Sequence, residues 1–145
     1  MRKICHLSLF LFFLNSACIA SGYFSSGVSG GLSSTGTGLV ENFGAIIQTP
    51  AAATVPMGVV DFAGTVTAAR TKCEAGSLTA NFQICTSGGS CTSITGCSAV
   101  SVTTSTASTT CTAAASVSAG NYLQVVITSP SSASYCQLGV KFTRS

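Results

Sequence analysis

The sequence is poor in the side chains that commonly recognise nucleic acids. Charged residues make up 6% of the 145 residues, tryptophan is absent, and histidine occurs once. No basic cluster is large enough to neutralise several phosphates, which argues against a nucleic-acid partner. After the first twenty residues, no run approaches the roughly 20 apolar residues that cross a bilayer. We therefore expect no nucleic-acid partner and no transmembrane segment in the mature chain.

The same shortage argues against catalysis. General acid–base chemistry needs two titratable groups within reach of each other, and the three carboxylates, Glu41, Asp61 and Glu74, lie in separate segments. A serine activated by Lys72 or Lys141 is compatible with the composition. Serine is so abundant, however, that such a match carries no information. We expect the protein not to be an enzyme.

Residues 1–20 have the layout of a secretory signal peptide. Arg2 and Lys3 precede an apolar run of 11 residues, Ile4 to Leu14, and small residues follow up to Ala20. The only histidine, His6, lies in this segment. Cleavage after Ala20 would leave four cationic and three anionic side chains, a net charge of about +1.

A second processing route is open. The run LNSAC resembles a bacterial lipobox, in which Cys18 would be the lipidated residue. It departs from the motif at Asn15, where leucine is preferred. An uncleaved N-terminal anchor is the third alternative. All three export the protein, so we expect it to be secreted or held at the cell surface.

Cysteine is abundant where charge is scarce. Two of the eight cysteines precede residue 20, and an even number in a small exported chain indicates disulfides. Zinc sites use closely spaced cysteines or histidines, and redox centres commonly use C-x-x-C; the mature chain has neither pattern. We therefore expect three disulfides, no metal and no cofactor. The six cysteines are Cys73, Cys85, Cys91, Cys97, Cys111 and Cys136.

Six cysteines allow 15 pairings, and the strand and turn pattern favours one. The run TSGGS supplies turn residues between Cys85 and Cys91, and we expect Cys85 to end a strand on its polar side. The favoured pairs are Cys85–Cys91, Cys97–Cys111 and, by what remains, Cys73–Cys136. The other pairings stay open.

From residue 39 onward, short apolar–polar alternations are separated by turn residues, which predicts strands and no long helix. Residues 39–145 are therefore expected to form one antiparallel, jelly-roll-like β-sandwich stapled by disulfides. Residues 21–38, rich in Gly, Ser and Thr, are expected to be a flexible lead-in. The side chains expected to point inward include Leu78, Ala80, Phe82, Ile84, Leu123, Val125, Ile127, Cys136, Leu138, Val140 and Phe142.

Two local features of the sandwich are also predicted. The run from residue 58 to 70 is expected to be one strand with a possible bulge at Gly64. Pro130 and the serines around it are expected to turn the chain after the strand that ends at Thr128. In the first run the expected inward side chains are Val60, Phe62, Val66 and Ala68.

Five segments between Val55 and Phe142 follow a familiar order. They are VPMGVVDFAGTV, TANFQICTSGGSCTSI, the loop flanked by Cys97 and Cys111, VSAGNYLQVVIT and LGVKF. This order resembles jelly-roll domains of secreted bacterial proteins and phage fibre tips, with a broadly C1q/TNF-like architecture. Asn121 replaces the acidic residue that usually follows the glycine of the fourth segment. The resemblance implies a compact, often trimeric display or attachment module.

Two functions fit these features. The first is a non-enzymatic extracellular or cell-surface module with a structural, adhesion or assembly role. A homotrimer of such modules would use an exposed face that includes Tyr122 and Val126; ordinary packing within the second sheet is the alternative role of these two side chains. The second is a ligand-binding module, for instance for glycans, which bind aromatic rings and amides. Without tryptophan, the candidates are Asn121 and Tyr135, expected in loops at one end of the sandwich.

Overall fold

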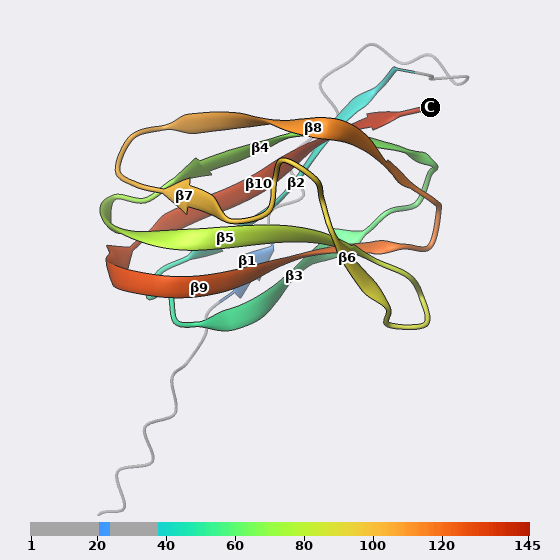
Figure 1. Ribbon diagram of the computed structural model, residues 1–145. Coiled ribbons are helices and arrows are strands. Elements are labelled where there is room, and N and C mark those ends of the chain that lie inside the picture. The colour runs from blue at the N-terminus through green and yellow to red at the C-terminus, as the bar shows by residue number, and fades with distance from the viewer. Residues whose placement is uncertain (1–20, 24–37) are drawn as a thin grey trace, which may run out of the picture.

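The computed structural model describes residues 21–23 and 38–145, which form two antiparallel β-sheets packed face to face (Figure 1). The predicted antiparallel β-sandwich is therefore confirmed. Over the described ranges, no helix is long and apolar enough to cross a membrane. The predicted signal peptide, with Cys18, and most of the predicted flexible lead-in lie outside the described residues.

The first sheet has five strands. In spatial order they are β1 (Ser21–Tyr23), β2 (Val40–Ile47), β10 (Cys136–Arg144), β4 (Gly64–Lys72) and β8 (Ala107–Val117). The C-terminal strand β10 lies at its centre, where it pairs with β2 along one edge and with β4 along the other. The last strand of the chain therefore completes this sheet.

The second sheet is built around β9 and β5. Its strands are β3 (Ala53–Val59), β9 (Tyr122–Ser134), β5 (Ala75–Cys85), β6 (Cys91–Ser93) and β7 (Val100–Val102). The short strands β6 and β7 pair with different parts of β5, and β9 pairs with β5 nearly end to end. From β2 to β5 and again from β8 to β10, successive strands alternate between the two sheets, so their inward faces meet in one core.

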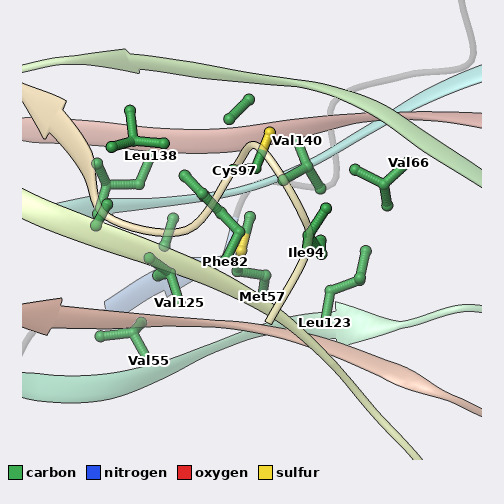
Figure 2. Packing of buried hydrophobic residues seen from close by; sticks show 14 of the residues in the cluster. Val55, Met57, Val66, Phe82, Ile94, Cys97, Leu123, Val125, Leu138 and Val140 are labelled. Atoms are coloured by element: carbon green, nitrogen blue, oxygen red, sulfur yellow. The ribbon is translucent and has the colours of Figure 1, made fainter. Parts of the chain in front are cut away.

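The core consists of the alternating apolar side chains that the period of two predicts. Among the described residues, Phe82 and Phe142 are the largest fully buried side chains. Figure 2 shows Phe82 packed among the other buried residues of the cluster. Burying a side chain of this kind stabilises the fold by roughly 1.5–3 kcal/mol. Of the side chains predicted to point inward on β5, β9 and β10, only Ile84 is half-buried; the others are buried.

The run from residue 58 to 70 is not one strand. β3 ends at Val59, β4 begins at Gly64, and the residues between them form a loop. Val60 is fully buried, as expected, but Phe62 is 40% exposed. The Phe62 ring is instead covered by the Arg144 guanidinium, whose Cζ lies 3.5 Å from the ring centroid.

The bulge predicted at Gly64 occurs further along β4. Opposite β10, the register shifts between Val66 and Ala68, so that Thr67 is the extra residue. Opposite β8, the extra residues lie in β8, between Thr110 and Ala115. The shift moves the next inward side chain by one place, and Ala69 is buried where Ala68 was expected. Gly64 has a different role, because a Cβ there would clash with the Phe142 ring and the Thr143 carbonyl.

The strand β9 does not end where its sequence suggests. Pro130 and its serine neighbours lie inside it, and the strand continues to Ser134. The pairing with β5 is irregular here, since Thr79 pairs with Thr128 but Ser77 pairs with Ser131. Irregular pairing accommodates a proline, which has no N–H to donate. Ser129 and Ser132 adopt positive φ angles of 49° and 48°.

Candidate functional site

Three disulfides tie the sandwich together, and their pairing is the one that the strand pattern favoured. They join Cys73 to Cys136, Cys85 to Cys91 and Cys97 to Cys111. The first links the ends of the adjacent strands β4 and β10, and the second closes the β5–β6 hairpin. The third joins the β6–β7 connection of the second sheet to β8 of the first. All six cysteines therefore have structural roles.

One detail of Cys85 differs from the prediction. Its position in β5 places it on the same face as Gln83, but its side chain is fully buried. Cys85 pairs with Tyr122 on one side and is bonded to the exposed Cys91 on the other. The disulfide therefore has one buried cysteine, Cys85, and one exposed cysteine, Cys91, on a face that is otherwise polar.

The residues proposed for a ligand loop, Asn121 and Tyr135, are not brought together. Asn121 directly precedes β9 and Tyr135 directly follows it. They lie 14 residues apart at opposite ends of the 13-residue strand β9, a separation of up to about 46 Å at about 3.3 Å per residue. The Asn121 carbonyl accepts a hydrogen bond from the N–H of Val60 at 2.8 Å, and Tyr135 is half exposed. No single loop site contains both.

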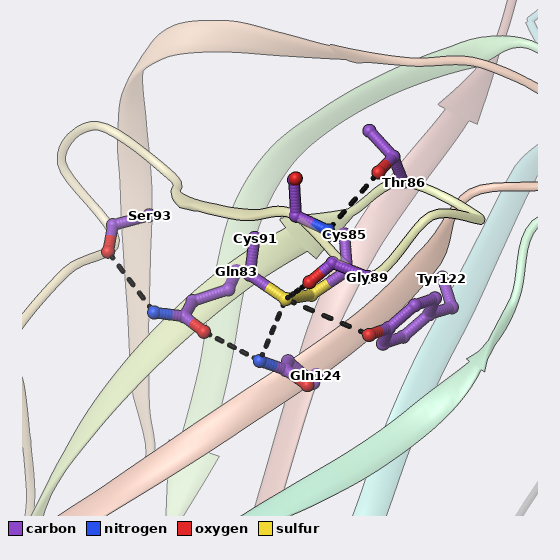
Figure 3. The surroundings of a disulfide bond; sticks show 9 residues. Gln83, Cys85, Thr86, Gly89, Cys91, Ser93, Tyr122 and Gln124 are labelled. Atoms are coloured by element: carbon purple, nitrogen blue, oxygen red, sulfur yellow. Dashed lines mark hydrogen bonds between the residues drawn. A yellow bond between two sulfur atoms is a disulfide. The ribbon is translucent and has the colours of Figure 1, made fainter.

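The outward side of the second sheet carries a connected set of amides and hydroxyls around the Cys85–Cys91 disulfide (Figure 3). We call it the amide face. Gln124 Nε2 donates to Gln83 Oε1 at 2.7 Å and lies 3.3 Å from Cys91 Sγ. The Ser93 hydroxyl accepts from Asn81 Nδ2 at 3.1 Å. The amide face consists of Asn81, Gln83, Cys91, Ser93, Tyr122, Gln124 and Val126, with Thr54 and Pro56 of β3 beside them.

The amide face has no charged side chain among these residues, and two of its apolar members are only half-buried. They are Tyr122 and Val126, which were predicted for an assembly face and do lie on the outward side of their sheet. Val59, at the end of the paired strand β3, is 59% exposed. The arrangement offers hydrogen bonds and apolar contact without charge.

The outward side of the first sheet is the opposite in character. We call it the cationic face, defined by Arg70, Lys72 and Lys141. These side chains alternate along β4 and β10 with buried residues, so they point away from the core. The carboxylates lie elsewhere: Asp61 is in the β3–β4 loop, Glu74 follows β4, and Glu41 is near the start of β2. They are too dispersed to form a carboxylate pair.

A hollow of about 490 Å³ lies on the cationic face. Its floor contains Gly44 of β2 and Gly139 of β10, which are direct cross-strand partners. It is lined by residues 42–46 of β2, residues 137–140 of β10 and Arg70 of β4. Sequence reasoning missed this site, because two glycines in strands 95 residues apart carry no signal until the register places them opposite each other.

A chemical site of another kind would need a group of side chains that binds a metal ion or activates a nucleophile. Among residues 21–23 and 38–145, no group of three His, Cys, Asp or Glu side chains could hold a metal ion. Lys72 and Lys141, the two possible bases for a serine, both lie on the open cationic face.

No protein-family model matches the chain, and comparison with curated proteins and with solved structures finds no significant match.

Proposed function

We propose that the protein is a non-enzymatic module that works outside the cell or at its surface, in display, adhesion or assembly. The observation that carries this proposal is a β-sandwich stapled by three disulfides. Disulfides form and persist in oxidising compartments, which indicates an extracellular module. The dispersed carboxylates and the purely structural cysteines support a role without catalysis.

We further propose that the sandwich is a jelly roll. Leaving β1 aside, the first sheet has the order β2-β10-β4-β8 and faces the order β3-β9-β5 with β6 and β7 at its edge. With the short strands β6 and β7 taken together as one interrupted strand beside β5, each sheet has four antiparallel strands, and this order supports the double Greek-key path of a jelly roll. This order supports the display and attachment roles implied by the sequence resemblance.

Assembly would use the amide face. Two copies that met through their cationic faces would bring Arg70, Lys72 and Lys141 against the same three cations, which is unfavourable. The amide face has no such repulsion, and it offers Val126, Tyr122 and exposed Val59 for apolar contact. We therefore place a homotrimer contact on this face.

Light scattering after size-exclusion chromatography tests the assembly. The mature protein should elute as a trimer at micromolar concentration, and a charge on the amide face should dissociate it. Val126→Glu is the direct variant, and Thr54→Glu places the charge at an exposed neighbour that pairs with Val126. Thr110→Glu, exposed on β8 of the other sheet, is the matched control. A monomeric parent protein would refute assembly through this face.

Export and anchoring need a separate measurement, because Cys18 and residues 1–20 lie outside the described residues. We propose export through the signal peptide, either with cleavage after Ala20 or with lipidation of Cys18. Intact mass spectrometry of the mature protein distinguishes the two by the first residue and by the mass of an attached lipid. A mature mass that includes residues 1–20 would contradict both routes.

A further inference from the structure

We propose that the hollow on the cationic face binds a carboxylated sugar unit, with the sugar ring over Gly44 and Gly139 and its carboxylate at Arg70. The site lies on the opposite side of the sandwich from the amide face. It is therefore independent of the assembly proposed above, and either proposal can fail without the other.

The first support is the shape of the hollow. On the outward side of the β2–β10 pair, the cross-strand pairs are Asn42 with Lys141, Gly44 with Gly139, and Ile46 with Gln137. The central pair has no side chains, so bare backbone forms a floor between two walls. The volume of about 490 Å³ lies within the range of small-molecule sites.

The second support is the choice of glycine. A glycine within a strand weakens it by roughly 0.5–1 kcal/mol relative to alanine, and often marks a close approach by a ligand or another backbone. Gly44 and Gly139 are not among the described glycines with positive φ, so the backbone conformation does not demand them. A Cβ at either residue would lie 3.1 Å from a backbone carbonyl oxygen of the other strand, so the close approach of the two strands also favours glycine. A side chain at either residue would in addition extend into the hollow.

The third support is charge. Arg70 lines the hollow and pairs with Gly139 from the β4 side, with its side chain exposed. A guanidinium binds a carboxylate through two parallel N–H donors, a geometry that a lysine cannot provide. Lys72 and Lys141 raise the local positive potential without a carboxylate on the same face. An anionic ligand is therefore favoured over a neutral or cationic one.

The remaining lining matches a sugar ring better than a simple anion. Ile46 offers an apolar surface to the C–H groups of the ring, while the Asn42 and Gln137 amides can donate to and accept from hydroxyls. Few polar groups around an apolar floor are typical of a ligand site. A uronic or sialic acid residue of a glycan combines the carboxylate, the hydroxyls and a pyranose ring with C–H groups on its face.

Nuclear magnetic resonance of the disulfide-bonded, full mature chain tests this directly. Methyl glucuronide is the probe, and methyl glucoside is the neutral match of the same ring size. We expect saturable shifts of the Gly44 and Gly139 amides with the glucuronide at millimolar concentration, while Gly120, which is remote in a β8–β9 turn, stays unchanged. Equal shifts with the glucoside, or no shifts with either sugar, would overturn the proposal.

Variants separate local recognition from general charge. Arg70→Gln should weaken glucuronide binding about tenfold, the effect of losing a hydrogen-bonded charge. Arg70→Lys keeps the charge but loses the paired donors, and should recover only part of the affinity. Lys72→Gln removes the same charge from the same face outside the lining and should leave binding within about twofold. An equal loss for Arg70→Gln and Lys72→Gln would show that only diffuse charge attracts the anion, and would refute a defined site.

Discussion

The disulfide between Cys97 and Cys111 joins the two sheets across one edge of the sandwich. Cys97 follows β6, and its carbonyl accepts a hydrogen bond from the N–H of Phe82 in β5. Cys111 lies in a part of β8 that bulges away from β4, since Val66 pairs with Ala115 but Ala68 pairs with Thr110. The bulge places a buried β8 cysteine within reach of the second sheet.

This geometry predicts unequal contributions from the disulfides. Replacing both Cys97 and Cys111 with alanine removes a link that closes 14 residues of sequence separation, against 6 for Cys85–Cys91. Loop-closure entropy gives losses of about 3 and about 2 kcal/mol respectively. Urea unfolding of the two double variants measures the difference. A smaller loss for the Cys97–Cys111 pair would mean that the link between the sheets adds nothing to folding.

Thr71 offers a stabilising substitution. Its side chain is 3% exposed inside the sandwich, and its Oγ1 has no hydrogen-bond partner among residues 21–23 and 38–145. An unsatisfied buried hydroxyl costs about 1–3 kcal/mol, so Thr71→Val should raise the unfolding free energy by about 1 kcal/mol. Thermal unfolding checks this. Thr71→Ser keeps the hydroxyl and loses a methyl group, so it should shift the stability in the opposite direction; stabilisation by both variants would contradict the explanation.

Gly64 should tolerate no side chain. A Cβ at this residue would meet the Phe142 ring and the Thr143 carbonyl, where β4 begins beside the end of β10. Overpacking of this kind costs about 1–3 kcal/mol, and Gly64→Ala should lower the melting temperature accordingly. Gly88→Ala is the control, because the nearest atom to its Cβ is 3.8 Å away. Equal melting temperatures for the two variants would argue against close packing at Gly64.

The contact of Arg144 with Phe62 should hold the C-terminus to the β3–β4 loop. Phe62→Leu keeps an apolar side chain but removes the ring, and should lose about 0.5–1 kcal/mol at this partly exposed position. Phe62→Tyr retains the ring and should be close to neutral. Hydrogen exchange of the Ser145 amide, which donates to Ala63 O at 3.1 Å, reports the contact locally. Unchanged exchange in Phe62→Leu would show that the ring does not restrain the terminus.

Patterns that depend on neighbours in sequence predicted much of the fold. The alternation along β5 and along the first part of β9 sets which side chains enter the core, because successive Cβ atoms of a strand point to opposite faces. Turn residues between Cys85 and Cys91 likewise determine a local hairpin. The pairs Cys85–Cys91 and Cys97–Cys111 are favoured because each closes a short segment of the chain, and Cys73–Cys136 is the pair that remains.

Where strands are long or irregular, local patterns were misleading. The turn signal at Pro130 suggested an early end to β9, but pairing with β5 extends the strand to Ser134. This extension separates Asn121 from Tyr135 and removes the predicted ligand loop. In β4, the extra residue Thr67 is set by the register with β10, so the burial of Ala69 in place of Ala68 could not be read from β4 alone.

The sequence by itself determined a disulfide-stapled sandwich with few charges, because these properties follow from composition and from a period of two. Only the tertiary structure decided where the charges and gaps lie. Gly44 meets Gly139, and Arg70 joins them, because β10 inserts between β2 and β4. The placement of these three residues side by side depends on the order and register of strands far apart in the chain. The packing of the whole core sets that order and register.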